Sequence, residues 1–336
     1  METRKLYYED PFQKGFATTV VSCDAVKGGY AVVLAETAFY PEGGGQPYDT
    51  GVLGEANVLE VHEKNGVITH LCDKPFEVGK SVSGKIDWAR RFDHMQQHSG
   101  EHICSGLICE RFHCDNVGFH MGADVVTIDF NADISWDELM EIEQLANLYI
   151  YEDHPIDIQF YRGAELDKVE YRSKKPLEGD VRIVSFPGAD CCACCGTHVV
   201  RSGQVGLVKF LSVQKFRDGV RIELLSGKRA HRYLSECWAQ DVRIAQALSV
   251  KPNASFAGVE RVLAELSALK QRCAKLEESV FAQTAAQYEG KGDVLLFEDE
   301  MSGDSLRKLC DAVTNHCGGR CAVFAGADGA YKYAIG

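Results

Sequence analysis

Four of the 14 cysteines in this 336-residue chain fall within five consecutive residues: Cys191, Cys192, Cys194 and Cys195. A disulfide framework of such richness is typical of much shorter secreted chains that carry a signal peptide. Residues 1–10 are mixed in charge and no apolar segment follows them. No apolar run approaches the roughly 18 residues that a membrane span needs. We therefore predict a cytoplasmic protein with no membrane partner, whose cysteines are free, packed, catalytic or metal-bound.

The charge balance restricts how the chain could meet nucleic acid. Its net charge of −13 argues against a protein that coats nucleic acid non-specifically, because such binding needs a basic face. Basic residues nevertheless gather locally. Residues 201–232 hold eight basic and two acidic side chains, and smaller patches lie at Arg90-Arg91 and Lys174-Lys175. The sequence therefore allows a local basic surface for RNA, although such a run is also typical of a solvated face.

The hydrophobic pattern favours an α+β fold with more than one domain. Residues 1–90 hold short β-branched runs separated by glycine turns, which predicts a small β-barrel-like domain. In residues 91–228, a helix is expected from about Asp93, and Ser135 with Glu138 resembles the capping box of a second helix. Further strands are expected at 125–130, 158–161, 181–186 and 205–213. Helices and strands do not alternate regularly, which disfavours a doubly wound sheet.

The remaining chain is predicted to be a helical connector, residues 229–289, followed by the start of a C-terminal α/β domain, residues 290–336. Apolar residues recur with the 3,4 spacing of a heptad seam: Val259, Val262, Leu266, Leu269, Cys273, Leu276 and Val280. Such a helix could pack on its own domain, form a hairpin with residues 229–250, or join a second copy of the chain. A homodimer through the helical and C-terminal regions is thus one expectation.

Two pairs of residues have the spacing of metal ligands. His98 and His102 lie four residues apart on a predicted helix, so that both imidazoles project to one side. Cys194 and His198 repeat that spacing around a glycine, and a thiolate with an imidazole is a zinc-type pair. Together the pairs supply three imidazoles and one thiolate, which is enough for one zinc ion.

Other readings of the same residues stay open. The cysteines could form a buried apolar patch, or a redox pair with CxxC spacing. Cys192 or Cys195 could replace Cys194 as a ligand, and His94 adds an imidazole one turn before His98. The segment from His98 to His102 also fits the H-x-x-E-H pattern of a zinc peptidase, with Glu101 as general base.

A glycine-rich segment follows the strand candidate at Phe39-Tyr40 within the predicted β-rich region. Gly43, Gly44 and Gly45 would let the backbone approach a ligand closely. A turn between strands would explain the glycines equally well. Thr37 before them and Gln46 after them add polar groups that a plain turn does not need.

These three motifs, in this order, resemble the editing domain of alanyl-tRNA synthetases and the free-standing alanyl-tRNA editing proteins of the AlaX family. The resemblance covers roughly residues 5–230, where Arg182 and the segment 119–122 also fit the family pattern. Residues 230–336 resemble the connector and an incomplete C-terminal domain of the synthetase. The resemblance implies a zinc-dependent aminoacyl-tRNA deacylase that binds the aminoacyl end of tRNA(Ala). Its implied substrate is tRNA(Ala) mischarged with serine, with glycine as a second candidate.

Site roles follow from the resemblance by position. His98, His102, Cys194 and His198 would bind the zinc, with the two helical histidines also serving catalysis. Thr37 would read the serine hydroxyl, although it could simply be a strand residue. Gln46 would belong to the catalytic set and, with the backbone of Gly43, Gly44 and Gly45, would line the pocket for the aminoacyl-adenosine. Arg201 and Arg217 of the local basic run are the further expected substrate contacts. Cys195 departs from the family, which usually has a second glycine there.

One feature of the expected metal site conflicts with catalysis. Four protein ligands make a closed tetrahedral site, which is typical of structural zinc. We therefore expect one ligand to be loose or absent in the resting state, or the zinc mainly to position the substrate. A non-catalytic zinc-containing module that binds tRNA is the remaining alternative.

Overall fold

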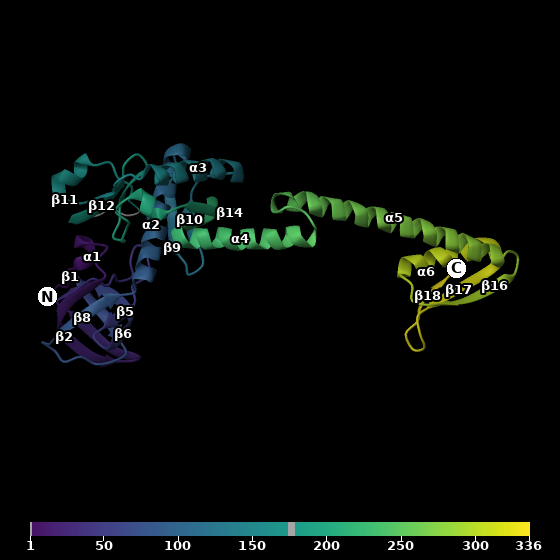
Figure 1. Cartoon of the computed structure of the whole chain (residues 1–336), viewed down its shortest axis with the longest axis horizontal. Coiled ribbons are helices and arrows are strands. Elements are labelled where there is room, and N and C mark those ends of the chain that lie inside the picture. Colours follow the sequence, from purple (N-terminus) through teal and green to yellow (C-terminus); the bar gives the residue numbers. More distant parts are fainter. Residues whose placement is uncertain (1, 174–178) are drawn as a thin grey trace. The chain divides into compact units, whose positions relative to one another are not determined.

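The computed structural model describes residues 2–173 and 179–336 and confirms a mixed α+β protein with several sheets. The chain forms two compact units, Met1–Glu236 and Cys237–Gly336, each of which is described by itself. Figure 1 shows the first unit in purple to green and the second in green to yellow. The predicted boundaries at residues 90, 228 and 289 stay predictions.

Six strands near the N-terminus close into a barrel with the order β2-β3-β7-β6-β5-β8. Inward-facing apolar side chains alternate with exposed ones along these strands, as in Gly15–Val26 and Ala56–Lys64. A short helix, α1 (Leu6–Glu9), and a two-stranded pair, β1 (Arg4–Lys5) with β4 (Glu36–Thr37), adjoin the barrel. The barrel strands are β2 (Gly15–Val26), β3 (Gly29–Leu34), β5 (Gly51–Leu53), β6 (Ala56–Lys64), β7 (Val67–Cys72) and β8 (Ser81–Ile86).

The helix α2 (Trp88–Phe112) is the central element of the first unit, and Figure 1 shows it leading away from the barrel. It begins five residues before Asp93, where the sequence placed its start. The reason is a cap: the Asp87 side chain accepts a hydrogen bond from Arg90 N at 3.2 Å. Side chains from 94 to 106 are buried, so the expected histidines lie inside the unit.

Two further sheets pack around α2. One has the order β14-β15-β10-β9, and the other has the order β11-β12-β13. The capping box of Ser135 and Glu138 is confirmed at the start of α3 (Trp136–Glu152). The strand expected at 205–213 begins at Val208 instead, because 202–205 form a 3-10 turn. The strands are β9 (Asn116–Met121), β10 (Val126–Phe130), β11 (Asp157–Arg162), β12 (Asp180–Phe186), β13 (Asp190–Ala193), β14 (Val208–Phe216) and β15 (Gly219–Ser226), with 3-10 helices η1 (Gly163–Lys168) and η2 (Ser202–Val205).

The second unit holds the predicted long helix and the C-terminal layer. The helix α4 (Gly227–Ala247) leads into this unit, and the 3-10 helix η3 (Pro252–Ala254) precedes α5 (Ser255–Gln287). The seam residues of α5 are exposed, with Leu269 57% and Val280 56% accessible, although α5 packs on α6 (Gly303–Cys317) of its own unit and buries Phe281 and Ala285 there. A second chain on this seam stays a prediction. The other elements are β16 (Gly292–Glu298), β17 (Gly318–Ala325) and β18 (Lys332–Ile335).

Among the described residues, no helix is both long enough and apolar enough to cross a membrane.

A fully buried ion pair joins the barrel to α2. Arg91 donates through Nε to both carboxylate oxygens of Asp49, at 3.2 and 3.0 Å, and both side chains are inaccessible to solvent. The same guanidinium donates to the carbonyls of Ala38 at 2.6 Å and Pro11 at 3.1 Å. Asp49 in turn accepts from Tyr40 N at 2.7 Å. This network fixes the segment 38–49 against the first turn of α2.

We predict that Arg91→Met lowers the free energy of unfolding by about 3–5 kcal/mol, because the Asp49 carboxylate would stay buried without its partner. Urea unfolding measures the loss. The control is Arg111→Met on the same helix, whose pair with Glu141 is exposed and contributes at most about 1 kcal/mol. Equal losses in the two variants would contradict a special role for the buried pair.

Candidate functional site

His98, His102, Cys194 and His198 come together in one buried cluster, with one potential ligand atom of each within 4.8 Å of all the others. The Sγ atom of Cys194 lies 3.5 Å from His98 Nε2 and 3.4 Å from His198 Nε2. The helix α2 supplies His98 and His102, and the loop after β13 supplies Cys194 and His198. The cluster could therefore hold a metal ion.

Each of the three imidazoles is held at its other ring nitrogen. His98 Nδ1 lies 2.9 Å from Gln46 Oε1, His102 Nδ1 lies 2.7 Å from Asp190 Oδ2, and His198 Nδ1 lies 3.3 Å from Ser99 Oγ. Such partners fix the tautomer and orientation of a metal-ligating histidine. The Nε2 atoms are thereby left to face Cys194 and one another.

Asp190 is itself held by a second cation. Arg172 donates to both of its carboxylate oxygens, at 2.7 and 2.8 Å. Burial raises the pKa of Asp190, but the hydrogen bonds from His102 and Arg172 outweigh this and lower it below its usual value. The carboxylate therefore stays charged and can orient the His102 ring.

The electrostatics of the cluster favour a thiolate at Cys194. Burial raises the pKa of this thiol, but the neighbouring His98 and His198 rings outweigh burial and lower it well below its usual range. Burial lowers the pKa of His198 to about 3, so this ring is neutral at physiological pH. A thiolate and a neutral imidazole are forms that bind metals. Burial opposes protonation of His102, but its hydrogen bonds to Asp190 and Cys194 outweigh burial and raise its pKa well above its usual value, so a metal ion that binds there displaces a proton.

Gln46 connects the glycine-rich segment to the cluster. Its Oε1 accepts from Thr197 N at 3.1 Å, and its Nε2 donates to Thr197 Oγ1 at 2.8 Å. Gly196 lies so close to His98 that a Cβ atom there would approach ring atom Cε1 to 2.2 Å. The residue at 196 must therefore be glycine for the two segments to meet.

A cavity of about 510 Å³ opens beside the cluster. Gly44 and Gly45 line it with positive φ angles of +57° and +83°. A Cβ atom at Gly45 would approach the Phe119 ring to 2.4 Å, so this glycine is needed for close packing. The complete lining is Gly44, Gly45, His98, Glu101, His102, Asn116, Val117, Gly118, Phe119, Arg172, Ser173, Cys192, Ala193, Cys194 and Cys195. Gly43 closes the turn through a bridge with Gln46.

The alternative ligands lie outside the four-residue cluster. Cys192 lies nearer to His102 and Asp190, and burial raises the pKa of its thiol to about 11. Cys195 lies 3.8 Å from the Tyr40 hydroxyl. Glu101, the general base of the peptidase alternative, accepts at Oε1 from Ser105 at 2.7 Å and Asn116 at 2.8 Å.

Thr37 lies inside the barrel and does not line this cavity. Its hydroxyl lies 2.9 Å from His70 Nε2 and accepts from Phe39 N at 3.1 Å. Burial lowers the pKa of His70 to about 4, so this ring is neutral. Because His70 Nδ1 lies 3.1 Å from the Val32 carbonyl, Nε2 is the acceptor of the Thr37 hydroxyl.

The two predicted arginine contacts also lie away from the cavity lining. Arg201 donates through Nε to Asp153 at 2.6 Å. Arg217 occupies the β14–β15 turn with a positive φ of +53° and faces the Phe216 ring. The Lys174-Lys175 patch lies outside the described residues.

No role was predicted from the sequence for Asp190, Ser99 or Arg172. A carboxylate four residues before Cys194 was a usable signal for Asp190, because metal-bound histidines commonly donate to a carboxylate. Arg172 carried no such signal, since nothing local links it to residue 190.

Two family models match parts of the chain. Residues 12–90 match class II (A) tRNA synthetases, and residues 181–223 match the second additional domain of threonyl- and alanyl-tRNA synthetases. The second match includes the cysteine cluster and His198.

Curated relatives extend the similarity to the whole chain. The alanine–tRNA ligase of Pyrococcus abyssi is 34% identical and aligns with 100% of this chain, which spans only 38% of that ligase. The alanyl-tRNA editing protein AlaX-L of Pyrococcus horikoshii is 31% identical, over 89% of this chain and 75% of its own. The editing protein Aarsd1-A of Xenopus laevis is 30% identical, over 84% and 73%. This chain therefore belongs to the alanyl-tRNA editing protein family.

We predict that the purified protein retains about one metal ion per chain and that Cys194→Ser lowers this content severalfold, because a hydroxyl is a much poorer ligand than a thiolate. Elemental analysis after dialysis measures the content. The control is Cys191→Ser, a neighbouring cysteine that does not line the cavity. Unchanged metal content in the Cys194 variant would show that the cluster is not the binding site.

Proposed function

We propose that this protein is a hydrolase that deacylates mischarged tRNA(Ala), with serine as the amino acid removed and glycine as a second candidate. The observation that carries the proposal is the buried cluster of three imidazoles and one thiolate at the edge of the glycine-lined cavity. Membership of the editing family supports the same activity.

We propose zinc as the metal of the cluster, because its donor set of three imidazole nitrogens and one thiolate suits zinc. In a tetrahedral site with Zn–S near 2.3 Å and Zn–N near 2.05 Å, sulfur and nitrogen ligands lie about 3.5 Å apart. The Cys194–His98 and Cys194–His198 distances of 3.5 and 3.4 Å fit this geometry. When bound, zinc supplies polarisation of the ester carbonyl and a water of lowered pKa.

The surrounding side chains would hold the substrate and handle protons. The Gly44 and Gly45 backbone, with Phe119, forms the wall against which the aminoacyl-adenosine would rest. Gln46 holds the His98 ring, so its contribution is to position a ligand. Glu101 lines the same cavity as a carboxylate and would accept a proton from the attacking water.

Rejection of correctly charged tRNA would follow from a polar pocket. A site that hydrogen-bonds the serine hydroxyl rejects alanine, because alanine leaves the polar group of the site unpaired. Thr37 stays our proposed reader of that hydroxyl. To bind the substrate hydroxyl, Thr37 must then give up its hydrogen bond with either His70 Nε2 or Phe39 N.

The remaining predictions concern the partners. Arg201 and Arg217 stay proposed contacts to the tRNA, outside the cavity. A homodimer through the helical and C-terminal regions and a cytoplasmic location also stay predictions.

Deacylation of Ser-, Gly- and Ala-tRNA(Ala) tests the proposal. We expect rapid release of serine, slow release of alanine, and loss of the activity after chelation that zinc restores. Glu101→Gln should lower the rate about 10²–10⁴-fold while the metal stays bound, because it removes only the proton acceptor. Full hydrolysis without metal would contradict catalysis by zinc, and peptide cleavage without ester cleavage would favour the peptidase alternative.

Substitution of Thr37 by valine tests whether this residue binds the serine hydroxyl. We expect Thr37→Val to reduce deacylation of Ser-tRNA(Ala) more than that of Gly-tRNA(Ala), because only serine presents a hydroxyl. Rates are measured at a temperature where circular dichroism shows both proteins folded. An equal loss on both substrates, together with a lower melting temperature, would assign Thr37 to the barrel alone.

A further inference from the structure

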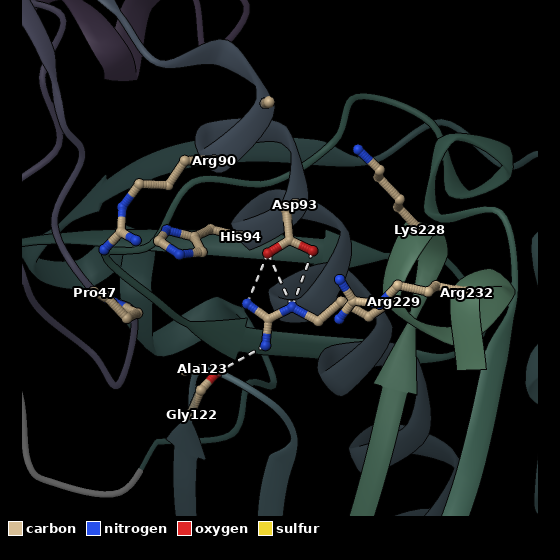
Figure 2. Close-up of a pocket in the computed structure, with 10 residues that line it drawn as sticks. Pro47, Arg90, Asp93, His94, Gly122, Ala123, Lys228, Arg229 and Arg232 are labelled. Carbon is tan, nitrogen blue, oxygen red and sulfur yellow. Dashed lines mark hydrogen bonds and ion pairs between the residues drawn. The ribbon is translucent and has the colours of Figure 1, made fainter. Parts of the chain in front are cut away.

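A second cavity, of about 420 Å³, adjoins the first turns of α2 and α4. Pro47 lines it, while the preceding Gln46 contacts the metal cluster, so the segment 46–47 connects the two sites. Figure 2 shows the side chains around this basic cavity. Its lining is Pro47, Ala89, Arg90, Asp93, His94, Gly122, Ala123, Lys228, Arg229 and Arg232.

Four basic side chains face this cavity against one carboxylate. Asp93 is already paired with Arg229, whose Nη2 donates to it at 2.7 Å and whose Nη1 donates to the Gly122 carbonyl at 2.7 Å. Arg232 lies 4.0 Å from Glu236, at the limit of an ion pair, and Arg90 donates to the Tyr48 carbonyl. The cavity therefore keeps an excess of positive charge in a chain whose net charge is −13.

His94 adds an unpaired polar atom to the cavity. Its side chain is 3% exposed, and its Nδ1 has no hydrogen-bond partner among the described residues. Burial, together with the neighbouring Arg90 and Arg229, lowers the pKa of this ring to about 3, so the ring is neutral. Since buried polar atoms are nearly always paired, this nitrogen points to a ligand group.

We propose that the basic cavity binds a backbone phosphate of the tRNA 3′ end, through Lys228, Arg232 and His94. This inference rests on the proposed function and adds where the RNA strand is held. His94 and His98 lie one helical turn apart, roughly 5–6 Å along α2. A terminal aminoacyl-adenosine at the metal cluster would thus place a preceding phosphate beside the cavity. An oxygen of that phosphate pairs with the two cations. The His94 ring must turn toward the cavity for Nδ1–H to donate to the same phosphate, because Nδ1 is buried in the structure.

Binding of an uncharged RNA oligonucleotide with the sequence of the tRNA 3′ end tests the proposal. Fluorescence anisotropy at several salt concentrations gives the Kd. We expect Lys228→Gln/Arg232→Gln to weaken binding at least tenfold and to reduce the slope of log Kd against log salt by about 0.7, since both cations contact one phosphate and each single-strand phosphate contact contributes about 0.7. The control, Lys27→Gln/Lys74→Gln, removes two exposed barrel lysines, and we expect it to bind like the unmodified protein.

His94 provides a second readout. We expect His94→Asn, whose amide can donate from a similar position, to keep binding within about threefold, and His94→Leu to lose about tenfold or more. An unchanged Kd and salt slope in the double variant, or equal losses in the control, would overturn the proposal. Binding of uncharged RNA needs no hydrolysis, so a protein that shows this pattern but cleaves no ester would refute the proposed function alone.

Discussion

The buried pair of Arg91 and Asp49 is the interaction on which the geometry of the first unit depends. It joins the segment between β4 and β5 to the start of the helix that carries His98 and His102. Because both charges are inaccessible to solvent, small displacements of either element would leave a charge unpaired. The glycine-rich segment is thereby held where Gln46 reaches the His98 ring.

The cluster derives its order from groups that do not face the ligand. Gln46, Asp190 and Ser99 each hold one imidazole at Nδ1, and they come from three separate segments of the chain. Such a prearranged set fits a site that is filled without rearrangement. Four fixed ligands also leave the metal no open coordination position. Catalysis at the metal therefore requires that one ligand exchange with substrate or water.

The sequence predicted the parts of the site that depend on local spacing. The pairs His98–His102 and Cys194–His198 were visible because a helical turn and a short loop bring i and i+4 together. Contacts set by tertiary packing could not be seen: Arg172 with Asp190, and Thr37 with His70, pair residues that are distant in the chain. The start of α2 was missed because Asp87 caps the helix before its apolar stripe begins. The heptad spacing of the α5 seam was clear from the sequence. The spacing alone does not determine whether the seam is buried or exposed in the folded chain.

We propose that three histidine Nε2 atoms and Cys194 Sγ together hold one zinc ion beside the cavity. X-ray absorption at the zinc edge of the purified protein tests it directly. We expect one sulfur at about 2.3 Å and three nitrogens at about 2.0–2.1 Å, with the sulfur signal lost in Cys194→Ser. A shell with two or more sulfurs, or one that keeps its sulfur in that variant, would contradict the claim.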